Sequence, residues 1–205
     1  TKGREGWTAL MEACFYGHKD VVQLLLERPS QDIDINARNA YGLTAFIYAC
    51  MKGHKDVVQL LLDHSERIEL NATNNSGLTG FMYACQFGHK DVVKLFLDHS
   101  DIIELNARNN FGKTAFMYAC QFGHKYVVKL LLDSSKRIEL NARDNHGRTA
   151  LMFACSARNS DVVELLLNHS DPRIDLNVKD NNGRTALMIA TQKSIVKLIT
   201  AKLNP

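Results

Sequence analysis

The 205-residue sequence lacks the segments that mark membrane and secreted proteins. It contains no apolar run near the roughly 18 residues that a membrane-spanning helix needs. Residues 1–6 also lack the apolar stretch of a secretory signal peptide. The chain begins with Thr1 instead of Met, from which we expect a processed or excised piece of a larger protein. No membrane partner is predicted.

The sequence also lacks the signatures of common catalytic and metal sites. It contains no phosphate-binding loop, no paired-carboxylate motif and no pattern that joins a nucleophile to a base. No Cys-x-x-Cys pair occurs, which argues against a zinc site. We therefore predict a protein with no enzymatic activity, no catalytic residues, no metal and no cofactor.

Strong charge of one sign is missing as well. The formal net charge is +3, and a charge this small indicates no particular class of partner. Its distribution is uneven, because residues 1–102 carry 10 basic and 13 acidic residues, whereas residues 103–205 carry 15 and 9. The second half could therefore attract an acidic partner. With 45% hydrophobic residues, the composition is that of a globular protein.

What the sequence does contain is an internal repeat. A Gly-x-Thr triplet begins at six positions that are 35 or 36 residues apart: Gly6, Gly42, Gly77, Gly112, Gly147 and Gly183. An apolar phrase such as Ala45-Phe46-Ile47 follows each triplet, and a second apolar run such as 21–26 comes later. The Thr of the triplet can cap a first helix, and a later Gly-His pair ends it. Residues 68–71 alternate like a short strand. Each unit thus predicts two short helices and an extended finger.

The phrase Gly-x-Thr-Ala-Leu-Met-x-Ala-Cys-x-x-Gly-His resembles the ankyrin repeat, six times in phase. The resemblance implies an all-α repeat solenoid with short β-hairpin fingers, built as an ankyrin-repeat stack of helix-turn-helix units in one domain, 1–205. The expected repeats are approximately 3–38, 39–73, 74–108, 109–143, 144–179 and 180–205, with the first and last as caps. Ala or Gly replaces the family's Pro in every copy, and the 36-residue copies carry Pro29 and Pro172 in the loop before the finger.

The cysteines and most histidines recur at fixed repeat positions. Cys14, Cys50, Cys85, Cys120 and Cys155 share one position. Equivalent positions on stacked helices lie about 8–10 Å apart, too far for a disulfide, so we interpret these residues as small buried hydrophobic side chains. Free buried thiols predict an intracellular, cytoplasmic protein, with a nuclear location as the alternative. The histidines are spread along the repeats and do not converge, which favours roles in turns and loops.

Aromatic and basic residues suggest where a partner binds. In the family, one face of each first helix and the finger tips line a concave groove, and the residue inside each Gly-x-Thr faces the same side. The positions that the resemblance assigns to this partner-binding face are Trp7, Phe15, Tyr16, Tyr41, Leu43, Tyr48, Met51, Tyr83, Phe87, Phe111, Lys113, Tyr118, Phe122, His146, Arg148 and Arg184. For Tyr48, Tyr83, Tyr118 and Phe153, packing between neighbouring helices is an equal alternative. A basic finger row is formed by Arg108, Arg143 and Lys179; solvated charge is its simplest interpretation, and binding of an acidic peptide or a phosphate-bearing ligand is the alternative.

The resemblance and the aromatic face together predict a protein–protein interaction module, a monomer that binds a partner peptide or protein surface in its concave groove. Two alternatives stay open. Aromatic stacking beside a basic finger row could bind a nucleotide or single-stranded nucleic acid, although the modest net charge argues against it. The repeats could also be a structural spacer or targeting arm of a larger protein. The identity of the partner does not follow from the fold.

Overall fold

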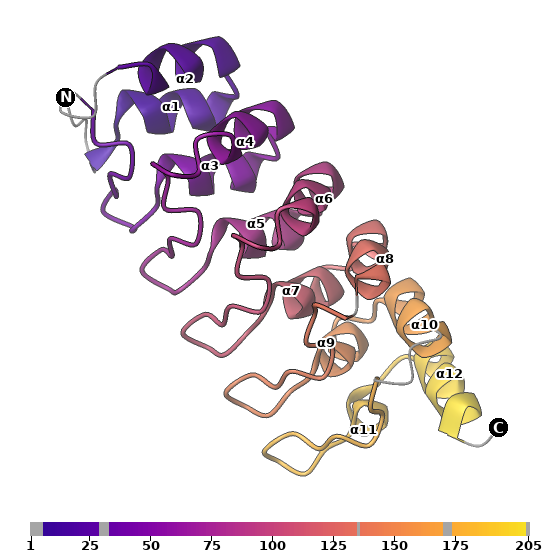
Figure 1. Cartoon of the computed structure of the whole chain (residues 1–205). Coiled ribbons are helices and arrows are strands. Elements are labelled where there is room, and N and C mark those ends of the chain that lie inside the picture. The colour runs from indigo at the N-terminus through magenta and orange to yellow at the C-terminus, as the bar shows by residue number, and fades with distance from the viewer. Residues whose placement is uncertain (1–5, 29–32, 135, 170–173, 204–205) are drawn as a thin grey trace. The chain divides into compact units, whose positions relative to one another are not determined.

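A computed structural model describes residues 6–28, 33–134, 136–169 and 174–203. Pro29 and Pro172, singled out in the sequence, lie outside the described residues. The chain divides into two compact units, which we call unit 1 (Thr1–Glu104) and unit 2 (Leu105–Pro205). Each unit is built from helix pairs joined by finger loops (Figure 1). No described helix is long and apolar enough to cross a membrane.

Unit 1 contains three helix pairs within its described residues. The helices are α1 (Ala9–Tyr16), α2 (Lys19–Leu26), α3 (Ala45–Lys52), α4 (Lys55–Leu62), α5 (Gly80–Phe87) and α6 (Lys90–Asp98). The first helices form one row, in which α3 packs against both α1 and α5. The second helices form another row, in which α4 packs against α2 and α6. The predicted stack of helix-turn-helix units is therefore confirmed here.

Unit 2 repeats this arrangement. Its helices are α7 (Ala115–Gln121), α8 (Lys125–Asp133), α9 (Ala150–Ser156), α10 (Ser160–Asn168), α11 (Ala186–Ile189) and α12 (Lys193–Leu203). Helix α9 packs against α7 and α11, and α10 packs against α8 and α12. The first helix of the last pair, α11, has only four residues, because the sequence has lost three residues at this point, including the Gly-His pair. The final helix α12 exposes Lys193, Lys197 and Lys202 to solvent.

The predicted threonine caps open five of the six first helices. In α3, the hydroxyl of Thr44 accepts a hydrogen bond from the backbone amide of Ile47 (3.2 Å). The threonines before α1, α5, α7 and α11 make the same bond, whereas Thr149 before α9 makes none. Each bond satisfies an amide that has no partner inside the helix, and such a cap contributes about 1 kcal/mol.

The glycine of the Gly-His pair ends the first helix as predicted. Gly53 follows α3 with φ of 75°, a left-handed conformation that favours glycine. A Cβ at this position would also collide with the His89 ring of the next repeat. The fifth repeat has Arg158 in the equivalent place, and this residue adopts φ of 61° in spite of its side chain. The backbone reversal is therefore kept at a cost in strain.

A continuous layer of apolar side chains fills the space between the two rows of helices in each unit. Val57, Val92, Val127 and Val162 are each about 1% exposed, whereas Val21 at the start of unit 1 is 40% exposed. All five cysteines are buried, which confirms their interpretation as core residues. Burial raises the pKa of the Cys14 and Cys155 thiols to about 12, so they stay protonated.

The fingers reverse direction as predicted but contain almost no β-structure. Among the described residues, the single β-bridge joins Thr73 and Thr79. The segment 68–71 alternates buried and exposed side chains but is not a strand. Its amides pair locally, as Leu70 donates to Ile68 (2.9 Å), or with a side chain, as Glu69 donates to Asn36 Oδ1 (2.9 Å). Side-chain amides thus take the place of a strand ladder.

Candidate partner-binding surface

A buried or partly buried polar side chain holds each of five described fingers to the helix that follows it. In unit 1, Asn39 Oδ1 accepts the backbone amides of Tyr41 (2.9 Å) and Leu43 (3.0 Å). The same asparagine donates through Nδ2 to the Tyr48 hydroxyl (2.8 Å). Asn74 with Tyr83 (2.9 Å) and Asn109 with Tyr118 (2.8 Å) repeat the arrangement. The finger tip is therefore fixed relative to the first helix.

The last two fingers, both in unit 2, use a different pair for the same purpose. Asp144 occupies the asparagine position and accepts the amides of His146 (2.9 Å) and Arg148 (2.8 Å) through Oδ1. Its second oxygen accepts from Arg148 Nε (3.0 Å) and Nη2 (2.8 Å). Asp180 and Arg184 form the equivalent ion pair at 2.8 Å. Both carboxylates are buried, so the arginines neutralise them where water cannot.

Sequence reasoning missed these pairs, although a signal was present. A tyrosine nine residues after the finger asparagine accompanies Asn39, Asn74 and Asn109. Where the finger residue is aspartate, the ninth residue is Phe153 or Ile189 and arginine stands inside the Gly-x-Thr triplet. The two substitutions compensate each other, since an amide needs an acceptor and a carboxylate needs a donor.

In unit 1, four aromatic rings and a lysine gather beside the first finger. The Trp7 ring lies 4.6 Å from Tyr48 and 5.6 Å from Phe15, between ring centroids. Phe15 also contacts Tyr16 (5.0 Å), and Lys52 Nζ lies 4.2 Å from the Phe15 centroid. Trp7 and Phe15 are partly exposed, so this cluster contributes both packing and surface. Lys52 adds a cation to a face that is otherwise aromatic.

In unit 2, two cations lie against one buried ring. Lys113 Nζ is 4.4 Å and the Arg148 guanidinium 4.5 Å from the Phe153 centroid. Lys113 also donates to Gln121 Oε1 (2.8 Å). Burial lowers the pKa of Lys113 from its ordinary value, and the neighbouring Arg148 charge lowers it further. These predicted site residues are therefore held in fixed positions at the base of the fingers.

Several of the predicted aromatics are exposed to solvent. Phe87 and Phe122, at the ends of α5 and α7, are 48% and 49% exposed. Tyr41 and Phe111 at the finger tips are 56% and 59% exposed, and Tyr16 is 58% exposed. Phe87 lies parallel to Tyr83 at 6.3 Å, and Phe122 stacks with Tyr118 at 6.4 Å. Large exposed apolar side chains that recur at the same two repeat positions are typical of an interaction surface.

Other predicted residues are packed inside the units. Leu43, Tyr48 and Tyr118 are 8%, 5% and 9% exposed, so they offer little area to a partner. For the two tyrosines, the structure favours the alternative of packing between helices, which the hydroxyl bonds to the finger asparagines reinforce. Met51 and Tyr83 are intermediate, and burial raises the pKa of Tyr83. His146 and Arg184 are exposed.

The basic finger residues tie neighbouring repeats together. Arg108 Nη1 donates to the Arg143 carbonyl (2.6 Å), and its Nη2 lies 3.5 Å from Glu139. Arg143 donates in turn to the Lys179 carbonyl (2.9 Å). Arg38 in unit 1 makes the corresponding bonds to Thr73 and Glu69. Their charges remain partly exposed, but their position is set by these structural bonds.

The histidines that follow the helix-ending glycines also tie neighbouring repeats together. His54 Nε2 lies 2.9 Å from the Phe15 carbonyl and His89 Nε2 lies 2.8 Å from the Met51 carbonyl, each at the end of the preceding first helix. Asn159 replaces histidine in the fifth repeat and donates to the Cys120 and Gln121 carbonyls. Within the part of the chain that the structure describes, no three His, Cys, Asp or Glu side chains converge on a point where a metal could bind.

Comparisons with known proteins agree with this architecture. The family model described as ankyrin repeats, in three copies, matches residues 1–74, 66–144 and 137–204. No match was found among curated proteins. Among solved structures, the ankyrin repeat domain of Bcl-3, described as a unique member of the IkappaB protein family, has a TM-score of 0.82 and 23% sequence identity, covering 98% of this chain and 85% of that chain.

A second solved structure, the ankyrin repeat protein EF0377, is 28% identical with a TM-score of 0.80, covering 95% of this chain and 96% of that one. Ankyrin repeats are generally protein–protein interaction modules. The family-model match extends over nearly all of the sequence, and the helix pairs, threonine caps and glycine reversals recur in its phase. The chain therefore belongs to the ankyrin-repeat family.

Proposed function

We propose that this protein binds a partner protein through exposed aromatic side chains on the finger side of its first helices. The observation that supports this proposal most directly is the solvent exposure of five aromatic side chains on an otherwise well-packed scaffold. They are 48–59% exposed: Tyr16, Tyr41, Phe87, Phe111 and Phe122. We call Tyr16, Tyr41 and Phe87 the unit 1 aromatic surface, and Phe111 and Phe122 the unit 2 aromatic surface.

The energetics of these side chains support the proposal. Fully burying one phenylalanine side chain contributes about 1.5–3 kcal/mol. Because Phe111 and Phe122 are already about half buried, covering their remaining area would contribute about half of that value each, toward the roughly 8 kcal/mol of a micromolar complex. The backbone that carries them is held by the Asn–Tyr and Asp–Arg pairs, so little conformational entropy is lost on binding.

Cations beside the aromatic surfaces give the partner an orientation. In unit 2, Lys113 is partly exposed near Tyr118, and Arg148 and Arg184 stand one repeat apart. Arg148 is fixed by Asp144, which makes its remaining N–H groups a preorganised donor set for a carboxylate. In unit 1, Leu43 and Leu78 occupy the positions of these cations. A partner that contacts unit 2 is therefore expected to present acidic groups next to its apolar anchors.

The experiment is a quantitative pull-down from lysate with four chains. Phe87→Asp tests unit 1 and Phe111→Asp/Phe122→Asp tests unit 2, because an aspartate replaces an apolar contact by a charge that must be desolvated. The matched control is Leu24→Asp/Tyr126→Asp, which changes side chains that are 64% and 75% exposed on the second helices α2 and α8. Circular dichroism melts check that all four chains are folded.

We expect the control to retain the partner and at least one aromatic variant to lose it. Retention by both aromatic variants would contradict the proposal. Each capture is repeated with nuclease, because binding of single-stranded nucleic acid by aromatic stacking remains the alternative prediction. If the captured material is lost only after nuclease treatment, the protein-binding proposal is wrong and nucleic-acid binding takes its place.

A further inference from the structure

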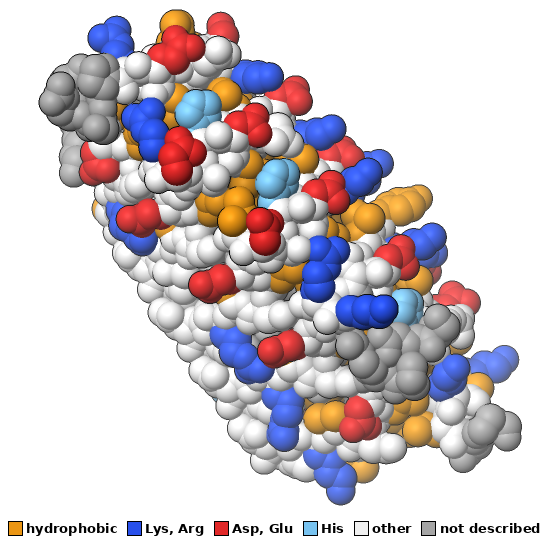
Figure 2. All heavy atoms as spheres, in the orientation of Figure 1, with side chains coloured by type: hydrophobic (Ala, Val, Ile, Leu, Met, Phe, Trp, Pro, Cys, Tyr) orange, Lys and Arg blue, Asp and Glu red, His pale blue; other side chains and the backbone are white. Residues whose placement is uncertain are grey.

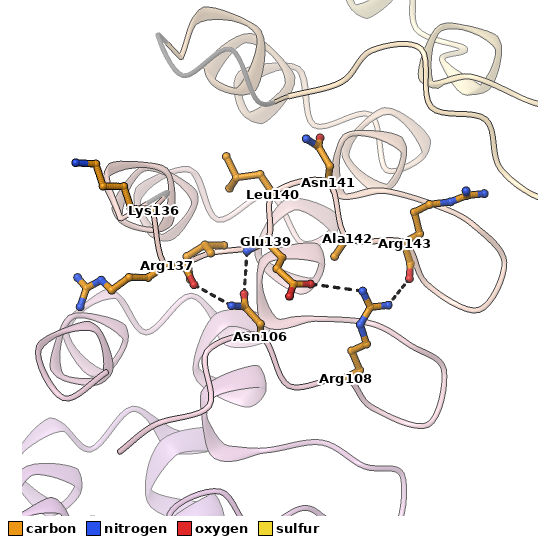
Figure 3. Close-up of a pocket in the computed structure, with 10 residues that line it drawn as sticks. Asn106, Arg108, Lys136, Arg137, Glu139, Leu140, Asn141, Ala142 and Arg143 are labelled. Carbon is orange, nitrogen blue, oxygen red and sulfur yellow. Dashed lines mark hydrogen bonds and ion pairs between the residues drawn. The ribbon is translucent and has the colours of Figure 1, made fainter. Parts of the chain in front are cut away.

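A hollow of about 640 Å³ lies in unit 2 between the first half of one finger and the loop that leads into the next (Figure 3). Asn106 and Arg108 line it from the first finger, and residues 136–143 line it from the second. Two of its lining residues, Arg108 and Arg143, belong to the basic finger row, and none belongs to the predicted partner-binding face. The hollow is therefore a feature separate from the unit 2 aromatic surface.

Hydrogen bonds across the hollow hold its walls in place. Asn106 donates to the Arg137 carbonyl (2.8 Å) and accepts the Glu139 amide (2.9 Å). Arg108 reaches across to the Arg143 carbonyl and to the Glu139 carboxylate, as Figure 3 shows. Both side chains span from one repeat to the next. The shape of the hollow is consequently part of the folded unit and does not depend on a ligand.

Positive charge dominates this lining. Arg108, Lys136, Arg137 and Arg143 contribute four cations, and Glu139 contributes the one carboxylate among the lining residues. All four cationic residues are exposed, so their charges border solvent. Unit 2 as a whole has 15 basic and 8 acidic residues, a net charge of +7, which adds a field of the same sign.

Unit 1 contains the same structure with the charge removed. Residues 66–73 differ from 136–143 only at Glu66 against Lys136 and Thr73 against Arg143. Asn36 makes the same two bonds across the fingers as Asn106, and Arg38 the same two as Arg108. The formal charge of the corresponding residues is +3 in unit 2 and zero in unit 1. Two substitutions alone thus separate the basic lining of the hollow from the neutral set of residues at the corresponding positions of unit 1.

We propose that the hollow of unit 2 is a second binding site, for an acidic peptide segment of a protein partner. Arg143 already donates to the Gly147 and Lys179 carbonyls, so it and its neighbours would attract carboxylates mainly through their charge, and Lys136 adds a flexible cation at the rim. No aromatic side chain lines the hollow, so it lacks the stacking platforms that single-stranded nucleic acid uses. Glu139 partly neutralises Arg108, which disfavours a small isolated anion and favours a ligand with several carboxylates.

The probe is a fluorescein-labelled octaglutamate peptide, titrated against the full chain by fluorescence anisotropy at 50 mM salt. Lys136→Glu/Arg143→Thr gives the hollow the residues of its unit 1 counterpart and is expected to weaken binding about tenfold, since two exposed ion pairs of up to about 0.7 kcal/mol each are lost. Glu139→Gln is expected to strengthen binding, because it removes the opposing carboxylate. Equal affinity for wild type and Lys136→Glu/Arg143→Thr would overturn the proposal.

The reciprocal variant guards against a trivial loss of folding. Glu66→Lys/Thr73→Arg should create a second site in unit 1 and raise the stoichiometry from one peptide to two.

Amide chemical-shift changes near Asn106 and Asn141 in the wild type would place the peptide in the hollow, whereas changes confined to other segments would refute the assignment. Unlabelled oligothymidine and unlabelled octaglutamate are compared as competitors of the labelled peptide. If oligothymidine displaces the labelled peptide at a lower concentration than octaglutamate does, nucleic acid is the preferred ligand and the peptide proposal is overturned. The Phe111→Asp/Phe122→Asp variant should bind the probe normally, which separates this site from the proposed function.

Discussion

Units 1 and 2 use one backbone design to present two different chemistries. In two described fingers of unit 1 an uncharged asparagine, Asn39 or Asn74, is bonded to a tyrosine hydroxyl, and a leucine stands inside the Gly-x-Thr triplet. The last two fingers of unit 2 carry the buried aspartates Asp144 and Asp180, paired with arginines. Acidic and basic side chains are interspersed on the face shown in Figure 2, so the contrast lies in the fingers rather than over this whole face.

The difference shows that a repeat family can exchange a buried hydrogen bond for a buried ion pair without changing the fold. In both cases Oδ1 accepts two backbone amides, and only the second side-chain atom changes from donor to acceptor. The partner group changes with it. A buried polar atom without a partner costs about 1–3 kcal/mol, which explains why the exchange takes place in pairs.

The largest expected effect comes from separating such a pair. Asp144→Asn keeps the two amide bonds but places an NH₂ group against the Arg148 guanidinium, where no acceptor is present. We expect a loss of about 2 kcal/mol in the free energy of unfolding, since hydrogen bonds to charged groups are worth about 1.5–3 kcal/mol. Urea denaturation measures the change.

A compensated variant provides the control for this prediction. Asp144→Asn/Arg148→Leu/Phe153→Tyr converts the unit 2 finger into the unit 1 type and should recover most of the lost stability. If the triple variant is no more stable than Asp144→Asn alone, the two pairs are not interchangeable and the comparison between the units fails.

A second prediction concerns a glycine that unit 1 has at the start of α5. A Cβ on Gly80 would lie 2.8 Å from Cys50 Sγ and 3.3 Å from the Phe46 ring, whereas the equivalent residue of α9 in unit 2 is Ala150. Gly80→Ala should therefore destabilise the chain by about 1–2 kcal/mol, the usual cost of overpacking a core. Cys50→Ala/Gly80→Ala should restore part of the loss. An increase in melting temperature for Gly80→Ala alone would show that the site relaxes freely.

A third prediction concerns a substitution that should stabilise the protein. Arg158→Gly in unit 2 relieves the left-handed strain and gives the fifth repeat the residue that Gly53 supplies in unit 1. We expect stabilisation by about 1 kcal/mol, in line with the cost of this conformation for a residue with a Cβ. Differential scanning calorimetry would detect the corresponding rise in melting temperature. Arg158→Ala, which keeps a Cβ, is the control and should give no such rise.

The smallest expected effect is a local dependence on pH. Hydrogen bonds from the Arg184 backbone and side chain, with the Asn182 amide, hold the pKa of Asp180 below its ordinary value of 3.8. Because the folded pKa is the lower one, its stabilisation is complete above pH 3.8 and is lost as pH falls through the folded pKa. Hydrogen exchange at the Arg184 amide should therefore accelerate below pH 4 more than the intrinsic rate predicts.

The unit 1 fingers serve as the internal reference for this measurement. Asn39 and Asn74 do not titrate, so the Leu43 and Leu78 amides that they bind should keep constant protection over the same pH range. Equal acceleration at Leu43 and Arg184 would indicate global acid unfolding and would remove Asp180 as the cause.

Much of the scaffold could be predicted from local sequence. The Gly-x-Thr triplets placed the starts of the first helices, and the Gly-His pairs placed their ends, because caps and left-handed turns depend on a few adjacent residues. The buried cysteines followed from their repeat position. The near absence of β-ladders in the fingers could not be foreseen, since it depends on asparagine side chains such as Asn36 and Asn71 that bond to the next repeat.

For the candidate partner-binding surface too, some features follow from local sequence and others from tertiary packing. By itself, the sequence determined the repeat phase, the helix pairs and the positions at which aromatic and basic residues recur, because these depend on periodicity and neighbouring residues. Only the tertiary structure decided that Tyr48 and Tyr118 are buried while Phe87 and Phe122 are exposed, and that Arg108 and Arg143 line a hollow with Lys136. Exposure and pairing of a side chain are set by the repeat packed beside it, about 35 residues away in the chain.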